Sequence, residues 1–277
     1  MKLKRYSTKW TSYVKSCLIA VGLSATMLGT AQDVTTGLIL HYDFENMPGT
    51  AAGTTLTDKS GTGNNGTIQG ALIDSAGYAG RGLYFATKDD YIKLPENITS
   101  SLKSFTYATW AYFTTANNAR LFDFGNTTDD NNPSDNLCFM PNNANGKARM
   151  RYRTTGGAIG INVDATTATP VGQWAHIAVT FDWNESTSAG TATIYINGVA
   201  CGTSTFSNFN PSLLGTTAYN FIGRSRWAQD SNGLNAVLDD VRLYNRALTS
   251  RDIMGFRQQH RMDADAHSET QFIENIR

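Results

Sequence analysis

Apolar and polar residues alternate in short runs along most of the chain, and small or polar residues separate the runs. In SFTYATWAYF, for example, Phe105, Tyr107 and Phe113 fall on one side, and Trp110 and Tyr112 fall on the other. A period of two residues is typical of a β-strand, because successive side chains point to opposite faces of the sheet. The segment therefore predicts a long strand with an aromatic face.

About a dozen such strands are predicted after residue 32, with no helical pattern between them. WAHIAVTFDW alternates in the same way, with Ile177, Val179 and Phe181 opposite Trp174 and His176. Short strands at close intervals indicate a two-sheet sandwich or a barrel. We expect an all-β protein.

The strand pattern ends with a short helical signal. In LTSRDIMGF, Thr249 stands three residues before Asp252, an approximate capping box. With no linker and no internal repeat upstream, we expect one domain over residues 32–257, closed by a short C-terminal helix. Residues 258–277 are polar and weakly periodic, and we expect them to form a tail.

A carboxylate interrupts the apolar positions of the last predicted strand, AVLDDVRLYN. Val237, Asp239, Val241 and Leu243 alternate, so a regular strand places all four on one face, which we expect to look into the core. A buried unpaired carboxylate costs several kcal/mol, so Asp239 needs a partner. Asp240 falls on the opposite face, where we expect it to be solvated.

The first 31 residues have the composition of a secretory signal peptide. MKLKRYSTKWTSYVKSC carries five basic residues and no acidic one, LIAVGLSATMLGTA is apolar, and small residues precede Gln32. The apolar run is short for a membrane span, and an uncleaved anchor is the alternative. We expect a secreted protein, extracellular, periplasmic or on the outer cell surface, without a membrane span once residues 1–31 are removed.

Charge and cysteine content fit an exported protein. The leader holds five of the 23 basic residues, so cleavage leaves 18 basic and 23 acidic residues, an acidic balance that argues against nucleic-acid binding. Cys138 and Cys201 remain after cleavage. They would form either a disulfide in an oxidising compartment or two separate buried thiols.

Several segments together resemble a known family. In order they are LHYDFEN, LTDKSGTGNNGTIQGA, GYAGRGLYFATKDDYIKLP, SFTYATWAYF, QWAHIAVTFD, TATIYINGV, FIGRS and LDDVRLYNRALTSRDI. Their order and spacing resemble the laminin-G-like jelly-roll domain of bacterial secreted proteins, within the concanavalin A-like lectin and glucanase group. The resemblance covers nearly all of residues 37–257. It implies a jelly-roll sandwich, usually a non-catalytic module that recognises glycans or protein surfaces and often binds calcium.

The resemblance also implies a role for Asp239. In this superfamily a structural Ca²⁺ commonly ties the first strand to the last, and a carboxylate in a D-x-V-[RK] strand is a recurrent ligand that Asp239 matches. Further oxygen atoms are expected from Asp43, Glu45 and the turn at Gly82, since Ca²⁺ takes six to eight oxygen ligands. The alternative partner of Asp239 is an arginine, such as Arg81 or Arg246.

Catalytic and nucleotide-binding motifs are weak. GTGNNG matches a dinucleotide-binding pattern but is not followed by a helix, so we interpret it as a loop shaped by Asp58 and Ser60. None of the five glutamates begins the E-x-D-x-x-E pattern of related glycoside hydrolases. A hydrolase with an unrecognised carboxylate pair remains an alternative.

Sugar binding requires aromatic faces beside planar polar groups. RMRYRT and GRSRWAQD supply such residues outside the core pattern. We expect a ligand site built from Trp227, Arg226, Asp123 and Tyr152, whose partner is a glycan or another extracellular polymer. Two alternatives stay open: Trp227 caps the edge of the core, or the protein is an adhesion component that binds a protein surface.

Overall fold

The computed structural model describes residues 34–126, 135–153, 159–227, 229–259 and 262. The predicted signal peptide, residues 1–31, lies outside this part of the chain, as does nearly all of the predicted tail, residues 258–277. Within the described residues no helix is both long enough and apolar enough to cross a membrane.

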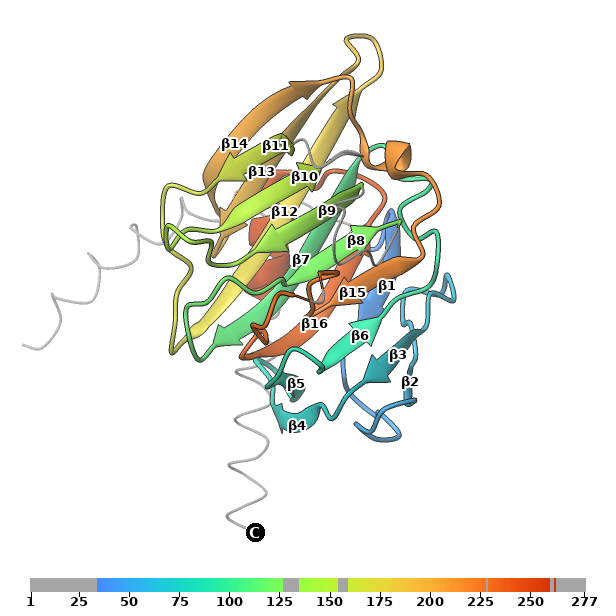
Figure 1. The fold of residues 1–277 in the computed structure, drawn as a ribbon, viewed down its shortest axis with the longest axis vertical. Coiled ribbons are helices and arrows are strands. Elements are labelled where there is room, and N and C mark those ends of the chain that lie inside the picture. Colours follow the sequence, from blue (N-terminus) through green and yellow to red (C-terminus); the bar gives the residue numbers. More distant parts are fainter. Residues whose placement is uncertain (1–33, 127–134, 154–158, 228, 260–261, 263–277) are drawn as a thin grey trace, which may run out of the picture. The chain divides into compact units, whose positions relative to one another are not determined.

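Two antiparallel sheets of eight strands each lie one over the other (Figure 1). Sheet I has the order β14(Val199–Ser207), β13(Ala189–Ile196), β12(Trp174–Asn184), β7(Phe105–Phe113), β16(Ala236–Tyr244), β5(Arg81–Phe85) and β4(Ile73–Ala76), and β1(Leu38–Tyr42) also pairs with β16. Sheet II has the order β11(Ile159–Asp164), β10(Arg149–Arg153), β9(Asn136–Met140), β8(Phe122–Gly125), β15(Tyr219–Ile222), β6(Tyr91–Lys93), β3(Gly66–Gln69) and β2(Thr55–Leu56). A 3₁₀ turn, η1(Pro211–Leu214), precedes β15. The predicted all-β jelly-roll sandwich is confirmed.

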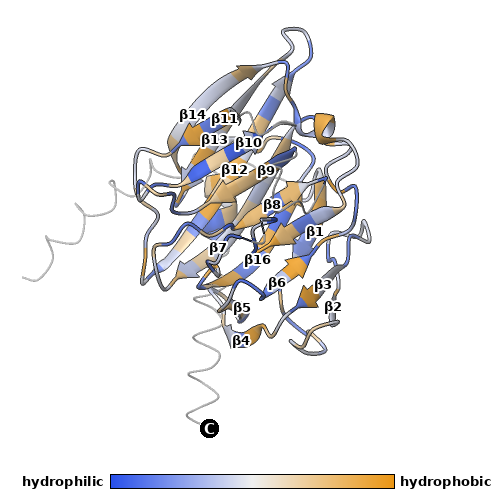
Figure 2. Cartoon of the chain, viewed as in Figure 1, coloured by the Kyte–Doolittle hydropathy of each residue, from blue (hydrophilic) through white to orange (hydrophobic). Residues whose placement is uncertain are grey.

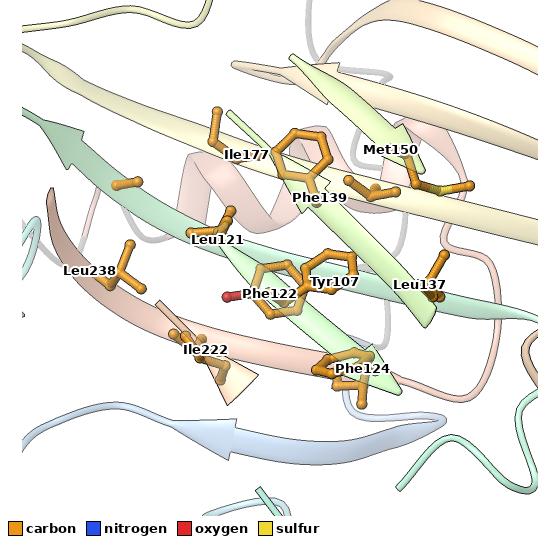
Figure 3. Close-up of a cluster of buried hydrophobic side chains, with 14 of the residues drawn as sticks. Tyr107, Leu121, Phe122, Phe124, Leu137, Phe139, Met150, Ile177, Ile222 and Leu238 are labelled. Carbon is orange, nitrogen blue, oxygen red and sulfur yellow. The ribbon is translucent and has the colours of Figure 1, made fainter. Parts of the chain in front are cut away.

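The core fills the space between the two sheets. Hydrophobic and hydrophilic positions alternate along the strands (Figure 2), and the apolar sets from both sheets meet in one aromatic-rich cluster (Figure 3). Phe105, Tyr107 and Phe113 share one face, as predicted, and that face looks into this core; Tyr107 lies 4.7 Å from Phe122 of sheet II between ring centroids. Burial of these side chains supplies most of the driving force for folding.

The predicted C-terminal helix is present at residues 250–259 and covers the outer face of sheet I. Its start is a reciprocal capping box: the backbone N–H of Thr249 donates to the Asp252 carboxylate, and the N–H of Asp252 donates to the Thr249 hydroxyl. Ile253 packs with Leu248, Ala108 and other residues of the sheet in a second, smaller apolar cluster.

A β-bulge in β16 changes the predicted direction of Asp239. Asp239 pairs with Trp110 and Arg242 with Ala108, so β16 holds one residue more than β7 between these points, and Asp240 adopts a φ of +51°. Val241 and Leu243 face the core as predicted. Asp239 lies on the other face, beside Trp110, and the prediction that it shares the core face with Val241 is wrong.

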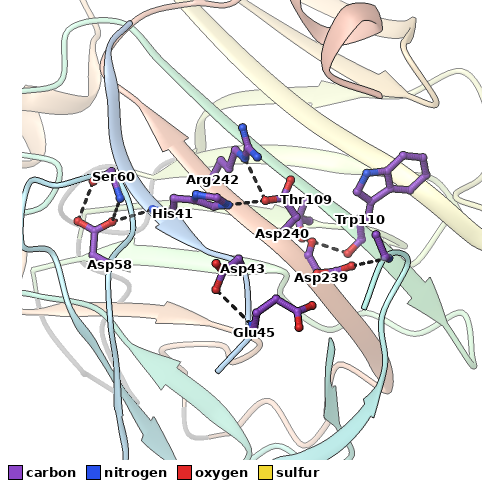
Figure 4. Close-up of polar contacts among 11 residues, drawn as sticks. His41, Asp43, Glu45, Asp58, Ser60, Thr109, Trp110, Asp239, Asp240 and Arg242 are labelled. Atoms are coloured by element: carbon purple, nitrogen blue, oxygen red, sulfur yellow. Dashed lines mark hydrogen bonds and ion pairs between the residues drawn. The ribbon is translucent and has the colours of Figure 1, made fainter. Parts of the chain in front are cut away.

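The prediction that Asp240 is solvated is also wrong. Asp240 is 1% exposed, and its carboxylate contacts His41 Nε2 at 2.5 Å and Arg242 Nε at 3.0 Å (Figure 4). The bulge turns this side chain toward β1, where the two basic groups offset the cost of burying its charge. The contact between residues 41 and 240 ties the first strand to the last.

Two further sequence questions are answered locally. The GTGNNG segment is a loop that leads into β3, and the Asp58 carboxylate just before it accepts hydrogen bonds from the backbone N–H groups of Ser60 and Asn64 and from the Ser60 hydroxyl. Cys138 and Cys201 are both buried free thiols, so the alternative of two separate thiols holds.

Candidate functional site

A small polar pocket lies on the outer face of sheet II. Because side chains alternate across each strand, β8 sends Phe122 and Phe124 into the core and Asp123 outward. The neighbouring strands β9 and β10 follow the same rule. The pocket is lined by Arg120, Asp123, Asn136, Cys138, Arg151, Arg153, Ser225 and Trp227.

The connection from β15 to β16 forms one wall of this outer-face pocket and passes in front of sheet II (Figure 1). The Asp230 carboxylate accepts hydrogen bonds from the Ser225 hydroxyl at 2.6 Å and from Arg120 Nη2 at 3.0 Å. The Ser225 hydroxyl in turn accepts from the backbone N–H of Trp227. Trp227 is therefore held in place by a network of hydrogen bonds that needs no ligand.

Arg226 anchors the same connection to the sheet. Its Nε lies 3.4 Å from Asp123 Oδ1, and its backbone N–H donates to Asp123 Oδ2 at 3.1 Å. Both side chains are at most 3% exposed. A Cβ at Gly125 would lie 2.6 Å from Arg226 Nε, so the glycine provides the space for the guanidinium.

Two arginines of β10 complete the pocket. The guanidinium carbon of Arg153 lies 4.5 Å from the centroid of the Trp227 ring, a cation–π contact. Arg151 Nη2 contacts the sulfur of Met140 at 3.6 Å. Burial lowers the pKa of Arg151, and the nearby positive charges of Arg120 and Arg153 act in the same direction.

The thiol of Cys138 lies among these charged groups without being reactive. Burial raises its pKa to about 11, and the negative charge of Asp123 adds to this effect. The thiol stays protonated at neutral pH, so the pocket offers no thiolate nucleophile at this position.

Three of the four predicted ligand-site residues come together, and the fourth does not. Trp227 and Asp123 line the pocket, and Arg226 pairs with Asp123 beneath it. Tyr152 instead points into the core, where its ring stacks on Phe209 at 3.6 Å between centroids. It lies between Arg151 and Arg153 in the sequence, so alternation places it on the opposite face of β10.

The predicted site left out six lining residues: Arg151 and Arg153, whose segment the sequence did single out, and Arg120, Asn136, Cys138 and Ser225. The strand pattern contains a signal for two of them, because Asn136 and Cys138 alternate with the apolar residues Leu137 and Phe139. Arg120 and Ser225 lie in connections outside the strands, where no periodicity predicts the direction of a side chain.

The predicted calcium region lies at the turn of residues 77–81. Asp239 Oδ2 accepts a hydrogen bond from the N–H of Ala79 at 3.0 Å, and Glu45 Oε1 accepts one from the N–H of Arg81 at 2.7 Å. Gly80 has a φ of +78°, and a Cβ there would lie 2.0 Å from Glu45 Oε1. The two carboxylates therefore meet on one turn.

The other residues considered for this region are placed differently. The Asp43 carboxylate accepts from the N–H of Glu45 at 3.2 Å (Figure 4), and Gly82 lies within β5. Arg81 pairs with Asp74, and Arg246 pairs with Asp252. In the described part of the chain, no three His, Cys, Asp or Glu side chains form a metal-binding group, so a cation here would depend on backbone carbonyls as well.

Comparison with known proteins identifies the fold. The sequence model of the concanavalin A-like lectin/glucanases superfamily matches residues 86–254. No curated protein matches the chain by sequence.

Solved structures with the same fold include binding domains and an enzyme. Domain 4 of AbnA, an extracellular arabinanase from Geobacillus stearothermophilus solved with arabinotriose, is 22% identical with a TM-score of 0.58, and the match covers 78% of this chain and 96% of that domain. The receptor-binding domain of the botulinum neurotoxin C/D mosaic serotype is 14% identical, with a TM-score of 0.56 over 80% of this chain and 51% of that one. Trypanosoma rangeli sialidase is 15% identical, with a TM-score of 0.56 over 82% of this chain and 33% of the enzyme.

The buried pair of Asp123 and Arg226 gives a prediction about stability. Asp123→Ala leaves the Arg226 guanidinium buried without this carboxylate, so we expect the free energy of unfolding to fall by about 3 kcal/mol. The double variant Asp123→Ala/Arg226→Met is expected to lose less than the sum of the two single variants. Urea denaturation followed by tryptophan fluorescence measures both effects.

Asp164→Ala is the matched control, because it removes the more exposed carboxylate that pairs with Arg149 in the same sheet. We expect it to cost less than about 1 kcal/mol. Equal losses for Asp123→Ala and Asp164→Ala would contradict the importance of the buried pair.

Proposed function

Because the chain belongs to the concanavalin A-like lectin/glucanase superfamily, we propose that it is a non-catalytic module that binds carbohydrate at the outer-face pocket. The observation that carries this proposal is the half-buried Trp227 ring, held beside guanidinium, carboxylate and amide groups on a hydrogen-bonded connection. Pyranose rings present both C–H patches and hydroxyl groups, which suit this mixture of an aromatic face and planar polar groups. AbnA domain 4, whose length this chain matches almost completely, was solved with arabinotriose. That complex supports a carbohydrate as the ligand of this chain.

The carboxylates of the pocket favour binding over hydrolysis. Glycoside hydrolysis needs one carboxyl group to donate a proton and a second to act as nucleophile or base. Here Asp123 is paired with Arg226 and accepts a hydrogen bond from Asn136, and Asp230 is paired with Arg120. Both carboxylates are therefore engaged by partners within the protein, an arrangement that favours a binding role over proton transfer to a glycosidic oxygen.

Replacement of Trp227 tests the proposal. Trp227→Ala is expected to weaken binding to the best ligand from a panel of arabinan, xylan and acidic polysaccharides by about 10-fold or more, since central aromatic contacts commonly contribute over 1.4 kcal/mol. The melting temperature should change little, because the connection is held by Ser225, Asp230 and Asp123. Isothermal titration calorimetry and thermal denaturation measure the two quantities.

Trp174→Ala provides the control, since Trp174 is a half-buried tryptophan on the outer face of sheet I. It should leave the affinity unchanged. If Trp174→Ala abolishes binding while Trp227→Ala does not, the ligand binds sheet I and the proposed site is wrong.

We also propose that the protein is exported and that residues 1–31 are removed. The support is the order of basic, apolar and small residues before Gln32. Intact-mass analysis of the protein recovered from outside the cytoplasm is expected to give a chain that starts at Gln32. A mass that includes Met1 would contradict this proposal.

A structural Ca²⁺ at the turn of residues 77–81 is a further proposal. Asp239 and Glu45 each accept a hydrogen bond from a backbone N–H of this turn, and carboxylate oxygens are hard ligands of the kind that Ca²⁺ prefers. Bound there, Ca²⁺ would neutralise two carboxylates that come from distant parts of the sequence. Gly80 has no side chain, which lets the Glu45 carboxylate lie close to the backbone of the turn. This role is structural and involves no reaction step.

Calcium should therefore raise the melting temperature. A free concentration 100-fold above Kd stabilises the folded state by about 2.7 kcal/mol, which corresponds to a rise of roughly 5–10 °C for a domain of this size. EGTA should reverse the rise, and Asp239→Asn should reduce it. Differential scanning calorimetry on protein stripped of metal measures the response.

Asp240→Asn separates calcium binding from general destabilisation. Asp240 contacts His41 and Arg242 instead of the turn, so its replacement should lower the melting temperature equally with calcium and with EGTA. Identical melting curves of the unsubstituted protein in both solutions would refute the calcium proposal.

A further inference from the structure

The outer-face pocket contains more positive than negative charge. Arg120, Arg151 and Arg153 line it and Arg226 lies beneath it, whereas the carboxylates that pair with these arginines come from Asp123 and Asp230. This local excess of positive charge contrasts with the rest of the chain after residue 31, in which acidic residues outnumber basic ones. The pocket is therefore a positive site on a chain that is otherwise mildly acidic.

Ion pairing divides the four arginines into two groups. Arg226 is paired with Asp123, and Arg120 is paired with Asp230. Among the described residues, neither Arg151 nor Arg153 is paired with a carboxylate. The Nε atoms of both are buried and make no hydrogen bond to another described residue. Because a buried donor without an acceptor is unfavourable, these two arginines favour an anionic ligand.

The spacing of the two arginines suits a single small anion. Arg151 and Arg153 are alternate residues of β10, so their side chains leave the same face of the sheet roughly 7 Å apart at the backbone. A guanidinium binds a carboxylate or a sulfate through two parallel hydrogen bonds. Side chains from two such positions can converge on one anion.

The neighbouring tryptophan indicates what carries the anion. Arg153 lies over the ring of Trp227, so one of the two charged groups is in contact with the proposed sugar-binding surface. A sugar ring beside Trp227 would bring a carboxylate or sulfate substituent within reach of both arginines.

We propose that the outer-face pocket recognises an acidic sugar, one that carries a carboxylate or a sulfate, and that Arg151 and Arg153 bind the anionic group. This inference rests on the proposed function and adds the chemical class of the ligand. A neutral sugar would add no carboxylate or sulfate partner for these two guanidinium groups, which pair with no carboxylate among the described residues.

Matched ligands test the inference. Isothermal titration calorimetry in about 0.15 M NaCl compares oligogalacturonate with its methyl ester, and carrageenan oligosaccharides before and after desulfation. At least one acidic member should bind about 10-fold or more tightly than its neutralised partner, and that preference should fall as salt rises, because salt screens the ion pairs. The pair that shows the preference identifies the anion as a carboxylate or a sulfate.

Variants of one strand supply the residue-level test. Arg151→Gln and Arg153→Gln should each remove most of the preference for the acidic member. Arg149→Gln is the matched control, because Arg149 leaves the same face of β10 but pairs with Asp164 outside the pocket. It should retain the affinity within about twofold. Melting temperatures of all three variants exclude unfolding as the cause, and Arg151→Lys, which keeps the charge, should retain part of the preference.

Two results would overturn the inference in different ways. If neutral members bind as tightly as acidic ones and only Trp227→Ala weakens them, the acidic class is wrong and the proposed function stands. If no member of either pair binds and arabinan and xylan do not bind either, both proposals fail.

Discussion

The alternation of side chains across β8, β9 and β10 links the hydrophobic core to the outer-face pocket. Each strand sends one set of residues inward and the next set outward, so Phe122 and Leu137 pack in the core while Asp123 and Arg151 reach the pocket. A slip of one residue in register would exchange the two sets and bury charged groups in the core. The energy that buries the aromatic side chains therefore also determines which polar groups face the pocket.

A β-bulge in β16 interrupts the same rule, and this exception positions the carboxylates of Asp239 and Asp240. The extra residue of the bulge turns Asp239 toward the turn of residues 77–81 and Asp240 toward His41 (Figure 4). Both contacts join segments that are far apart in the sequence. The last strand thereby ties the first strand and the β4–β5 turn to the centre of sheet I.

Sequence periodicity was sufficient for the faces of regular strands and insufficient elsewhere. The shared face of Phe105 and Tyr107, like that of Ile177 and Val179, follows from alternation alone. The direction of Asp239 does not, since a bulge adds a residue without changing the apolar pattern, and aspartate tolerates the positive φ that Asp240 adopts.

Tyr152 was misplaced although the same alternation, applied to Arg151 and Arg153, puts it in the core. The contacts of Trp227 depend on a long connection, whose path is determined by hydrogen bonds to Asp123 and Arg120 instead of by local propensity.

The most direct measurement of the central claim is a crystal structure of the protein with an acidic oligosaccharide that binds it in solution. We expect the sugar ring against Trp227 and its carboxylate or sulfate within hydrogen-bond distance of Arg151 and Arg153. The pair of Asp123 and Arg226 should stay intact beneath the ligand. An oligosaccharide bound instead on the outer face of sheet I, around Trp174, or at the turn of residues 77–81 would show that the outer-face pocket is not the binding site.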